Sequence, residues 1–270
     1  MNKNAIGVFD SGLGGLTAMK ELCKIMPHED IVYFGDTSRV PYGTRSADTI
    51  IRYARQDLNF LSTFEIKSAL VACGTISAVA LDTIKSDYSF PIVGVIESAA
   101  KAALKISKNR RIGILGTQAT VNSGAYERKL TEADPNCKTM SIPCPLFVPL
   151  VENGHTDPND PLTNGAIELY LSKLLPFKAD TIILGCTHYP IIAQAIRRFV
   201  GSETNLINPG KEAALTISSL LHENGMSNNA GVGKHSYYVS DSTDNFETYG
   251  SVFMGRSING EVHKIDIEKY

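Results

Sequence analysis

Short apolar runs recur along the chain and alternate with longer segments in which apolar residues return at helical spacing. The predicted strands are residues 5–9, 31–34, 68–72, 91–95, 111–115, 138–142, 181–184, 205–207 and 236–239. Several of these runs are continuously apolar rather than alternating, which is typical of parallel strands whose two faces are both covered. The pattern therefore predicts an α/β fold.

The segments between the predicted strands carry apolar stripes typical of amphipathic helices. The first stripe consists of Ile51, Ala54, Leu58 and Leu61. The second consists of Ile192, Ala195 or Ile196, and Phe199. Pro190 is predicted to be the first residue of this second helix. A third helix is predicted from Lys211, with Gly225 as its stop.

One sequence pattern occurs twice in the chain: an apolar run that ends on a cysteine with a threonine soon after it. Residues 68–77 read SALVACGTIS and residues 180–189 read DTIILGCTHY. The repetition predicts two pseudo-symmetric α/β domains with largely parallel sheets and the active site in the cleft between them. We assign residues 1–96 plus 208–270 to the first domain and residues 97–207 to the second. The polar tail from about residue 228 is expected to pack back on one domain.

Composition narrows the classes of function. The 270 residues are 43% hydrophobic with a formal net charge of −2, and they carry no block of like charge that would indicate a nucleic-acid or membrane surface. No apolar run approaches the roughly 18 residues of a membrane span, and the N-terminal apolar stretch is too short for a signal peptide. The five cysteines follow no disulfide-framework spacing, so we expect reduced thiols in a cytoplasmic protein.

The loop after the first predicted strand reads DSGLGGLTAMKEL. Its glycines permit a tight turn, but the dinucleotide pattern G-x-G-x-x-G fails because Thr17 takes the place of the third glycine. Asp10 would also repel a pyrophosphate. Two interpretations stay open: Asp10 and Ser11 cap the following helix, or Asp10 is a general base, or positions one, at a strand end.

The loop after the second predicted strand, residues 35–46, reads GDTSRVPYGTRS. It is long for a connection between a strand and a helix, and long ordered loops are often functional. The loop is either a wall of the site or a turn-rich surface loop around Pro41 and Gly43.

Cys73 and Cys186 differ from the other three cysteines because each ends a predicted strand and enters a helix start or a turn. Cys23, Cys137 and Cys144 are interpreted as small buried apolar residues. A helix N-terminus favours a thiolate and is expected to lower the pKa of such a cysteine from about 8.5. His188, two residues after Cys186, is placed to hold its proton or stabilise its anion.

Other cysteine chemistries fit less well. The chain has no C-x-x-C pair, zinc would need further ligands at sensible spacing, and a phosphatase-type loop would need arginine where Val79 stands. We therefore expect no metal. A single-nucleophile acyl transferase leaves the second thiol unused. Two like groups suit a reaction that removes a proton from one face of a carbon and returns one to the other.

Five segments identify a family that this chain resembles. They are DSGLGGLT, GDTSRVPYGT, VACGTISA, PLFVPLVENG and LGCTHYP. In order and spacing the chain resembles bacterial glutamate racemases, of the aspartate/glutamate racemase superfamily, over residues 5–210 and more weakly to the end. The resemblance implies a homodimer that interconverts L- and D-glutamate without a cofactor and supplies D-glutamate for peptidoglycan. The alternatives are racemisation of another acidic amino acid such as aspartate, and a non-catalytic two-lobed amino-acid-binding protein.

The resemblance also implies roles for individual residues. Cys73 would serve the α-proton of the D-enantiomer with help from Asp10, and Cys186 that of the L-enantiomer with help from His188. The implied substrate contacts are Asp10, Ser11, Tyr42, Gly43, Gly74, Thr75, Thr117, Thr187 and His188. Asp36 and Glu152 match acidic positions near the site and are expected to be accessory acids.

The chain departs from the family pattern in three places. Gly74 stands where the family usually has asparagine, which removes a side-chain amide worth about 1.5–3 kcal/mol if it met a charged group of the substrate. Asn208 replaces a common aspartate. The chain starts at its first strand, without the extension that binds a peptidoglycan precursor in some relatives, so no such activation is predicted.

Overall fold

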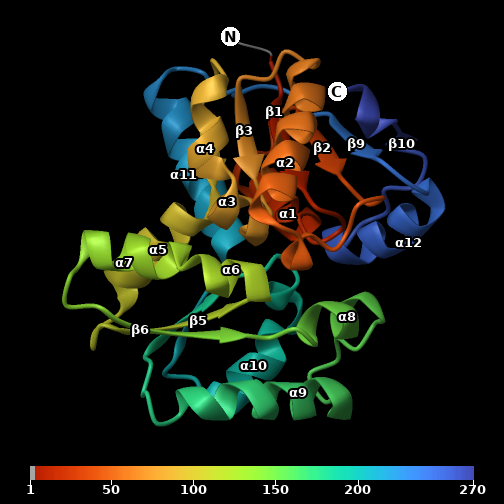
Figure 1. The fold of residues 1–270 in the computed structure, drawn as a ribbon. Helices are drawn as coiled ribbons and strands as arrows, with labels where there is room; N and C mark the ends of the chain where they lie inside the picture. Colours follow the sequence, from red (N-terminus) through yellow and green to blue (C-terminus); the bar gives the residue numbers. More distant parts are fainter. Residues whose placement is uncertain (1–3) are drawn as a thin grey trace.

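The computed structural model describes residues 4–270 and contains two parallel sheets (Figure 1). The first sheet has six strands in the order β10-β9-β2-β1-β3-β4. Its strands are β1 (Ile6–Asp10), β2 (Ile31–Gly35), β3 (Ser68–Val71), β4 (Ile92–Gly94), β9 (His235–Val239) and β10 (Val262–Lys264). All of its neighbouring strands are parallel, as the continuously apolar runs predict.

The second sheet has four parallel strands in the order β6-β5-β7-β8. Its strands are β5 (Arg111–Gly116), β6 (Lys138–Pro143), β7 (Thr181–Leu184) and β8 (Asn205–Ile207). We call the first sheet with the helices packed on it the first lobe, and the second sheet with its helices the second lobe. Figure 1 shows the two lobes one above the other, with β1 and the C-terminal end of the chain on the first lobe.

Helices connect the strands in both lobes. Those before β5 are α1 (Leu16–Ile25), α2 (Ala47–Ser62), α3 (Gly74–Val79), α4 (Leu81–Ile84) and α5 (Val95–Ile106). Those between β5 and β8 are α6 (Gln118–Ser123), α7 (Ala125–Ala133), α8 (Phe147–Glu152), α9 (Pro161–Leu171) and α10 (Ala193–Val200). The remaining ones are α11 (Pro209–Glu223) and α12 (Thr243–Met254). Within residues 4–270 no helix combines the length and the apolar character that crossing a bilayer requires.

Both faces of the first sheet are buried. Val8 and Leu70 belong to a cluster with helices α1 and α11, whereas Phe9 and Ala69 belong to a second cluster with α2. Successive strand residues point to opposite faces, so helices on both sides explain the unbroken apolar runs.

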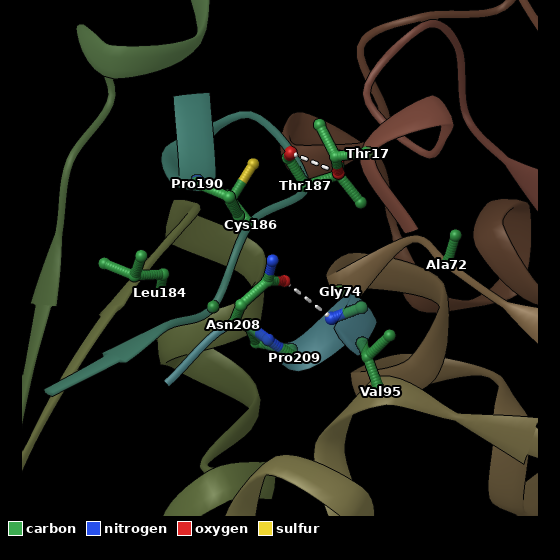
Figure 2. Close-up of a pocket in the computed structure, with 12 residues that line it drawn as sticks. Thr17, Ala72, Gly74, Val95, Leu184, Cys186, Thr187, Pro190, Asn208 and Pro209 are labelled. Atoms are coloured by element: carbon green, nitrogen blue, oxygen red, sulfur yellow. Dashed lines mark hydrogen bonds between the residues drawn. The ribbon is translucent and has the colours of Figure 1, made fainter. Parts of the chain in front are cut away.

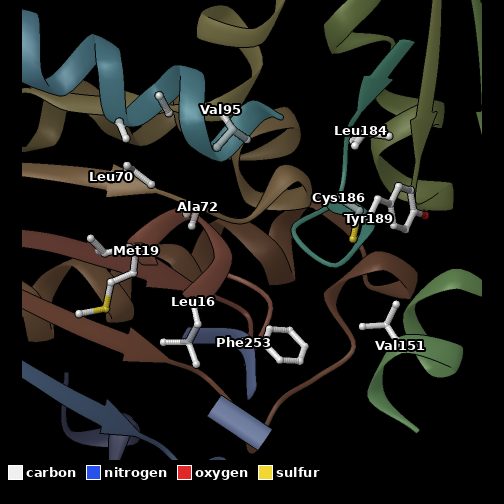
Figure 3. Packing of buried hydrophobic residues seen from close by; sticks show 14 of the residues in the cluster. Leu16, Met19, Leu70, Ala72, Val95, Val151, Leu184, Cys186, Tyr189 and Phe253 are labelled. Carbon is white, nitrogen blue, oxygen red and sulfur yellow. The ribbon is translucent and has the colours of Figure 1, made fainter. Parts of the chain in front are cut away.

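The first of these clusters also crosses from one lobe to the other. Figure 3 shows Leu70, Ala72 and Val95 of the first-lobe side together with Leu184, Cys186 and Tyr189 of the second lobe. The interface between the lobes is therefore partly an apolar core.

The chain passes between the lobes twice, through α5 and into α11. Helix α5 packs against α11, α7 and β7, so it contacts elements of both lobes. The sheets take their strands from residues 6–94 and 235–264 on one side and from residues 111–207 on the other. The domain division at residues 97 and 208 stays a prediction.

The tail packs on the first lobe, as expected. Strand β9 pairs with β2, and β10 pairs with β9. The segment before β9 is held by a buried ion pair, in which Lys67 Nζ lies 2.5 Å from Glu29 Oε2. Lys67 Nζ also donates to the carbonyl of Met226 at 2.8 Å, and Glu29 accepts from the Asn228 N–H at 2.8 Å.

Two details of the predicted elements are wrong. Pro190 does not start an α-helix: it lies in a 3₁₀ turn, Tyr189–Ile192, and α10 begins at Ala193. Helix α11 begins at Pro209, two residues before the predicted Lys211, because the Asn208 side chain accepts from the N–H groups of Gly210 and Lys211 and caps it. Gly225 follows this helix with a φ of 65°, in the left-handed region that glycine tolerates.

Candidate active site

The parallel registers bring four strand ends to the interface between the lobes. In the first lobe, β1 and β3 pair with Phe9 opposite Val71, so the segments 10–15 and 72–75 leave the sheet side by side. In the second lobe, Leu115 lies opposite Leu184, so Thr117 and Cys186 follow neighbouring strand ends. This is the carboxyl edge at which open α/β sheets bind their ligands.

A cavity of about 420 Å³ opens between these strand ends. The residues that line it include most of the predicted site: Ser11, Tyr42, Gly43, Cys73, Gly74, Thr75, Thr117, Glu152, Cys186, Thr187 and His188. Both strand-end thiols thus face one cavity, one from each lobe. Asp10 and Asp36 do not line it.

The surroundings of Cys73 are buried and carry a negative charge. Its Sγ lies 3.7 Å from Ser11 Oγ, and Cys73 is the residue that precedes helix α3. Burial, followed by the charge of Asp10, raises the pKa of the Cys73 thiol to about 12. The expected lowering by the helix start is therefore wrong for Cys73, because these two effects outweigh the nearby N–H groups.

Asp10 lies behind the cavity wall, where one of its oxygens holds the glycine-rich segment 11–15 by hydrogen bonds. Its Oδ2 accepts from the N–H groups of Gly12 and Gly15, both at 3.0 Å. Its Oδ1 is buried and has no hydrogen-bond partner among residues 4–270. Burial raises the pKa of Asp10, and the charge of His188 and the N–H groups of the loop only partly offset this.

The surroundings of Cys186 carry a positive charge. His188 Nδ1 lies 3.8 Å from Cys186 Sγ, and His188 Nε2 lies 2.9 Å from Glu152 Oε1. Burial lowers the pKa of His188, but the contacts with Cys186 and Glu152 outweigh it and raise that pKa to about 10. The ring edge also packs against Phe253 of α12, with ring centroids 5.7 Å apart. His188 is therefore a fixed imidazolium at neutral pH.

Asp36 is buried beneath the long loop, away from the cavity. It accepts from Arg39 Nε at 2.6 Å, from Ser240 Oγ at 2.8 Å, and from the hydroxyl of Tyr42. These bonds fold residues 35–46 into a wall of the cavity. They also turn the Tyr42 hydroxyl toward the carboxylates of Asp36 and Asp57.

Hydroxyl groups from both lobes meet across the cavity. Thr75 Oγ1 lies 3.1 Å from Thr117 Oγ1, which in turn lies 2.9 Å from Thr120 Oγ1. Thr187 Oγ1 lies 3.4 Å from His188 Nδ1. The site therefore offers several short, uncharged hydrogen-bond donors.

The charges of the cavity are unusual for an anion site. Among the described residues, no lysine or arginine lines this cavity, and His188 is the basic residue that does. No group of three or more His, Cys, Asp or Glu side chains in residues 4–270 is arranged to hold a metal ion. Recognition of a negatively charged ligand would fall to hydroxyls, backbone N–H groups and His188.

Several lining residues were not singled out from the sequence. They include Gln118, Cys144, Val148, Pro149 and Tyr189. Val148 and Pro149 belong to the quoted motif PLFVPLVENG, Tyr189 belongs to LGCTHYP, and Gln118 directly follows Thr117, so the motifs contained a signal for four of them. Cys144 is fully buried, as interpreted, and its Sγ donates to the carbonyl of Ile142 at 3.5 Å. All five cysteines are free, and Cys23 and Cys137 are partly exposed.

Gly74 and its neighbours lie where the two lobes touch. Figure 2 shows Thr17, Ala72 and Gly74 of the first lobe near Leu184, Cys186 and Thr187 of the second. Thr17 Oγ1 donates to the carbonyl of Thr187 at 2.8 Å across the interface. Gly14 also packs against Thr187 and His188 without room for a side chain.

Comparisons with known proteins agree with this geometry. The sequence profile of the Asp/Glu/hydantoin racemase family matches residues 10–216. A glutamate racemase of Geobacter metallireducens is 40% identical over 265 residues, which cover 98% of this chain and 97% of that protein.

Two crystal structures are also similar over the full fold. A glutamate racemase isoform from Bacillus anthracis has a TM-score of 0.93 and 35% identity, with 97% of each chain covered. The glutamate racemase of Francisella tularensis, in complex with D-glutamate, has a TM-score of 0.92 and 35% identity, with 100% of each chain covered.

Proposed function

This chain belongs to the Asp/Glu/hydantoin racemase family, and we propose that it interconverts L- and D-glutamate by moving the α-proton between two thiols. The observation that carries the proposal is that Cys73 and Cys186 line one cavity from opposite lobes. Inversion at a carbon needs one proton acceptor and one proton donor on opposite faces. The relatives named glutamate racemase over nearly the full length support glutamate as the substrate.

In the direction from L- to D-glutamate, Cys186 Sγ takes the α-proton. The α-carbon–hydrogen bond breaks, its electron pair stays on the α-carbon, and a new S–H bond forms on Cys186. The Cys73 S–H then breaks and delivers its proton to the opposite face. The reverse direction exchanges the two roles, so each turnover leaves the two thiols in exchanged protonation states.

The groups beside the two thiols support Cys186 as the proton acceptor and Cys73 as the proton donor in this direction. The imidazolium of His188, 3.8 Å from Cys186 Sγ, places a positive charge beside the sulfur that takes the proton of L-glutamate. The raised pKa of Cys73, about 12, favours a protonated thiol on the other side. In this arrangement the resting site is ready to accept L-glutamate, and Asp10 and His188 act on the thiols rather than on the substrate carbon.

The difficult step is the carbanion, because an α-proton of an amino acid is far less acidic than a thiol. Hydroxyls of Ser11, Thr75, Thr117 and Thr187 and the backbone N–H groups of Gly43 and Gly74 are the proposed donors to the substrate carboxylates. Donors fixed in place before the reaction are most effective where water is excluded. The proposal therefore requires that the lobes enclose the substrate.

The proposal also covers the cofactor requirement, the use of the product and the oligomeric state. The reaction needs no cofactor, since the two thiols and their partners supply every proton that moves. Its product is D-glutamate for peptidoglycan synthesis in the cytoplasm, and the resemblance to bacterial glutamate racemases suggests a homodimer. The molar mass of the protein in solution tests the last point.

A chiral assay tests the function. Purified protein is incubated with L-glutamate, D-glutamate, L-aspartate or D-aspartate without added cofactor, and the double variant Cys73→Ala/Cys186→Ala is the control. We expect both glutamate enantiomers to reach a 1:1 mixture with the native protein and to stay unchanged with the variant. Faster conversion of aspartate would assign a different substrate, and binding of glutamate without conversion would indicate a non-catalytic binding protein.

A further inference from the structure

Gly74 has no space for a side chain, and what blocks that space belongs to the other lobe. A Cβ placed on Gly74 would lie 2.5 Å from the backbone oxygen of Gly185 and 3.5 Å from its carbonyl carbon. The third nearest atom, Thr120 Oγ1 at 3.9 Å, also belongs to the second lobe. The contact is therefore one between two backbones across the interface.

The Gly185 side of this contact cannot retreat. The Gly185 N–H donates to the carbonyl of Leu115 at 2.7 Å, which fixes the segment against β5. A Cβ on Gly185 would lie 2.6 Å from the Leu115 oxygen and 3.0 Å from the Tyr126 ring. Gly185 is thus packed on its far side as tightly as on the side that faces Gly74.

The Gly74 side is fixed as well. Ala72 N–H donates to the carbonyl of Phe9 at 2.9 Å, and Ser77 N–H donates to the carbonyl of Cys73 at 2.9 Å, so the start of α3 is tied to the first sheet. Gly74 lies in the first turn of α3 and has no positive φ. The backbone at Gly74 would therefore accept alanine without local strain.

We infer that the contact between Gly74 and Gly185 limits how closely the lobes approach and so sets the separation of the two thiols. Gly74 follows Cys73, and Gly185 precedes Cys186. A backbone shift at this contact therefore displaces the cysteine next to it in each lobe. An atom inserted here pushes the lobes apart, because neither backbone can move within its own lobe. Gly74 is then a positioning residue for the reaction. The inference rests on the proposed function.

Gly74 would have a different effect if glycine at this position only removed a contact with the substrate. In that case, Gly74→Asn would restore an amide donor, lower KM and leave kcat unchanged. If Gly74 sets the lobe separation, the larger side chain instead moves the thiols apart. A misplacement on the order of 1 Å can cost about 100-fold in rate, so kcat should fall in the order glycine, alanine, asparagine.

The test compares Gly74→Ala and Gly74→Asn with the native protein and with Gly165→Ala. Gly165 lies in α9 and has open space for a Cβ, so its variant is a control for adding a methyl group. Steady-state kinetics give kcat and KM for glutamate, and the melting temperature shows that each variant is folded. Alkylation of each cysteine by iodoacetamide, followed by peptide mass analysis, reports access to Cys73 and Cys186 without reference to turnover.

The expected result is a fall in kcat of about 10- to 100-fold for Gly74→Ala, a larger fall for Gly74→Asn, and no fall for Gly165→Ala. Alkylation of Cys73 and Cys186, which are 5% and 9% exposed, should become several-fold faster, with the melting temperature unchanged. Native kcat in Gly74→Ala, a lower KM with unchanged kcat in Gly74→Asn, or unchanged alkylation would each overturn the inference. If the native protein does not racemise glutamate, the proposed function fails, whereas the alkylation rates still measure the separation of the lobes.

Discussion

The two thiols enter the cavity in the same way but have opposite surroundings. Cys73 and Cys186 each follow a central strand of a parallel sheet, one in each lobe. Cys73 has a buried carboxylate, Asp10, behind it. Cys186 has a buried imidazolium, His188, beside it. The backbone is thus pseudo-symmetric, whereas the electrostatics are not.

This difference teaches which part of a two-base site has to be symmetric. Each thiol must reach its own face of the same carbon, so the placement is shared. The resting protonation states have to differ, because one group must accept a proton while the other donates. The two identical side chains have opposite charges beside them: together with burial, the carboxylate of Asp10 raises the pKa of Cys73, and the imidazolium of His188 lies beside Cys186.

The largest effect is expected when either thiol is removed. Cys73→Ala or Cys186→Ala takes away one acid–base group, which typically contributes about 10²- to 10⁴-fold to a rate, and leaves no group on that face. We expect racemisation in each variant to fall by about 1,000-fold or more in both directions. Chiral analysis of the product measures it. A single variant with near-native racemisation would show that one thiol suffices.

The partners of the thiols should have effects that differ by substrate enantiomer. Asp10→Asn and His188→Gln are each expected to lower kcat/KM by about 10- to 1,000-fold. Because the equilibrium constant of a racemisation is one, this fall must be equal in both directions. The asymmetry should instead appear in the kinetic isotope effect with α-deuterated glutamate.

We expect Asp10→Asn to increase the isotope effect most for D-glutamate, and His188→Gln to increase it most for L-glutamate. Each substitution makes proton removal by its own thiol more rate-limiting. Equal isotope effects for the two enantiomers in both variants would contradict the assignment of Asp10 to Cys73 and of His188 to Cys186.

The imidazolium of His188 should also make stability depend on pH. Its pKa is raised from 6.5 to about 10 in the folded protein, so between these values the folded state holds a proton that the unfolded state has released. The stabilisation is fully present below pH 6.5 and is lost as the pH rises toward 10. Urea unfolding at pH 6, 8 and 10 should show the native protein losing stability faster than His188→Gln. Parallel curves would mean that folding does not raise the pKa of His188.

The smallest effect is expected at Glu152. Its side chain is 45% exposed, so solvent screens its attraction to His188. Glu152→Gln keeps a hydrogen-bond acceptor for His188 Nε2 and should lower kcat by at most about 10-fold. It should also keep most of the pH dependence of stability. A loss as large as that of His188→Gln would mean that Glu152 sets the charge state of the imidazole.

The sequence predicted the central elements better than the edges. All nine predicted strands are present, because the central ones are continuously apolar. Strand β10 was missed, since it has three residues and two of them, His263 and Lys264, are exposed. Only its pairing with β9, through long-range contacts that periodicity does not record, makes it a strand.

In the site, too, the sequence predicted what local pattern determines and not what long-range contacts determine. The strand-end position of Cys73, Cys186 and Thr117 follows from local pattern, and the cavity does bring them together. The orientation of Asp36 does not follow from pattern, because Arg39 and Tyr42 of its own loop and the distant Ser240 all hold it away from the cavity. The raised pKa of Cys73 likewise depends on burial and on Asp10, which lies 63 positions earlier in the sequence.

One isotope experiment tests the two-thiol site most directly. The protein is incubated with L-glutamate in deuterated water, and the reaction is stopped while little product has formed. If Cys73 donates a solvent-derived proton on the face opposite Cys186, the first D-glutamate carries deuterium at the α-carbon, whereas the remaining L-glutamate carries almost none. Deuterium entering the remaining L-glutamate as fast as the product, or product that keeps the original proton, would contradict two separate bases.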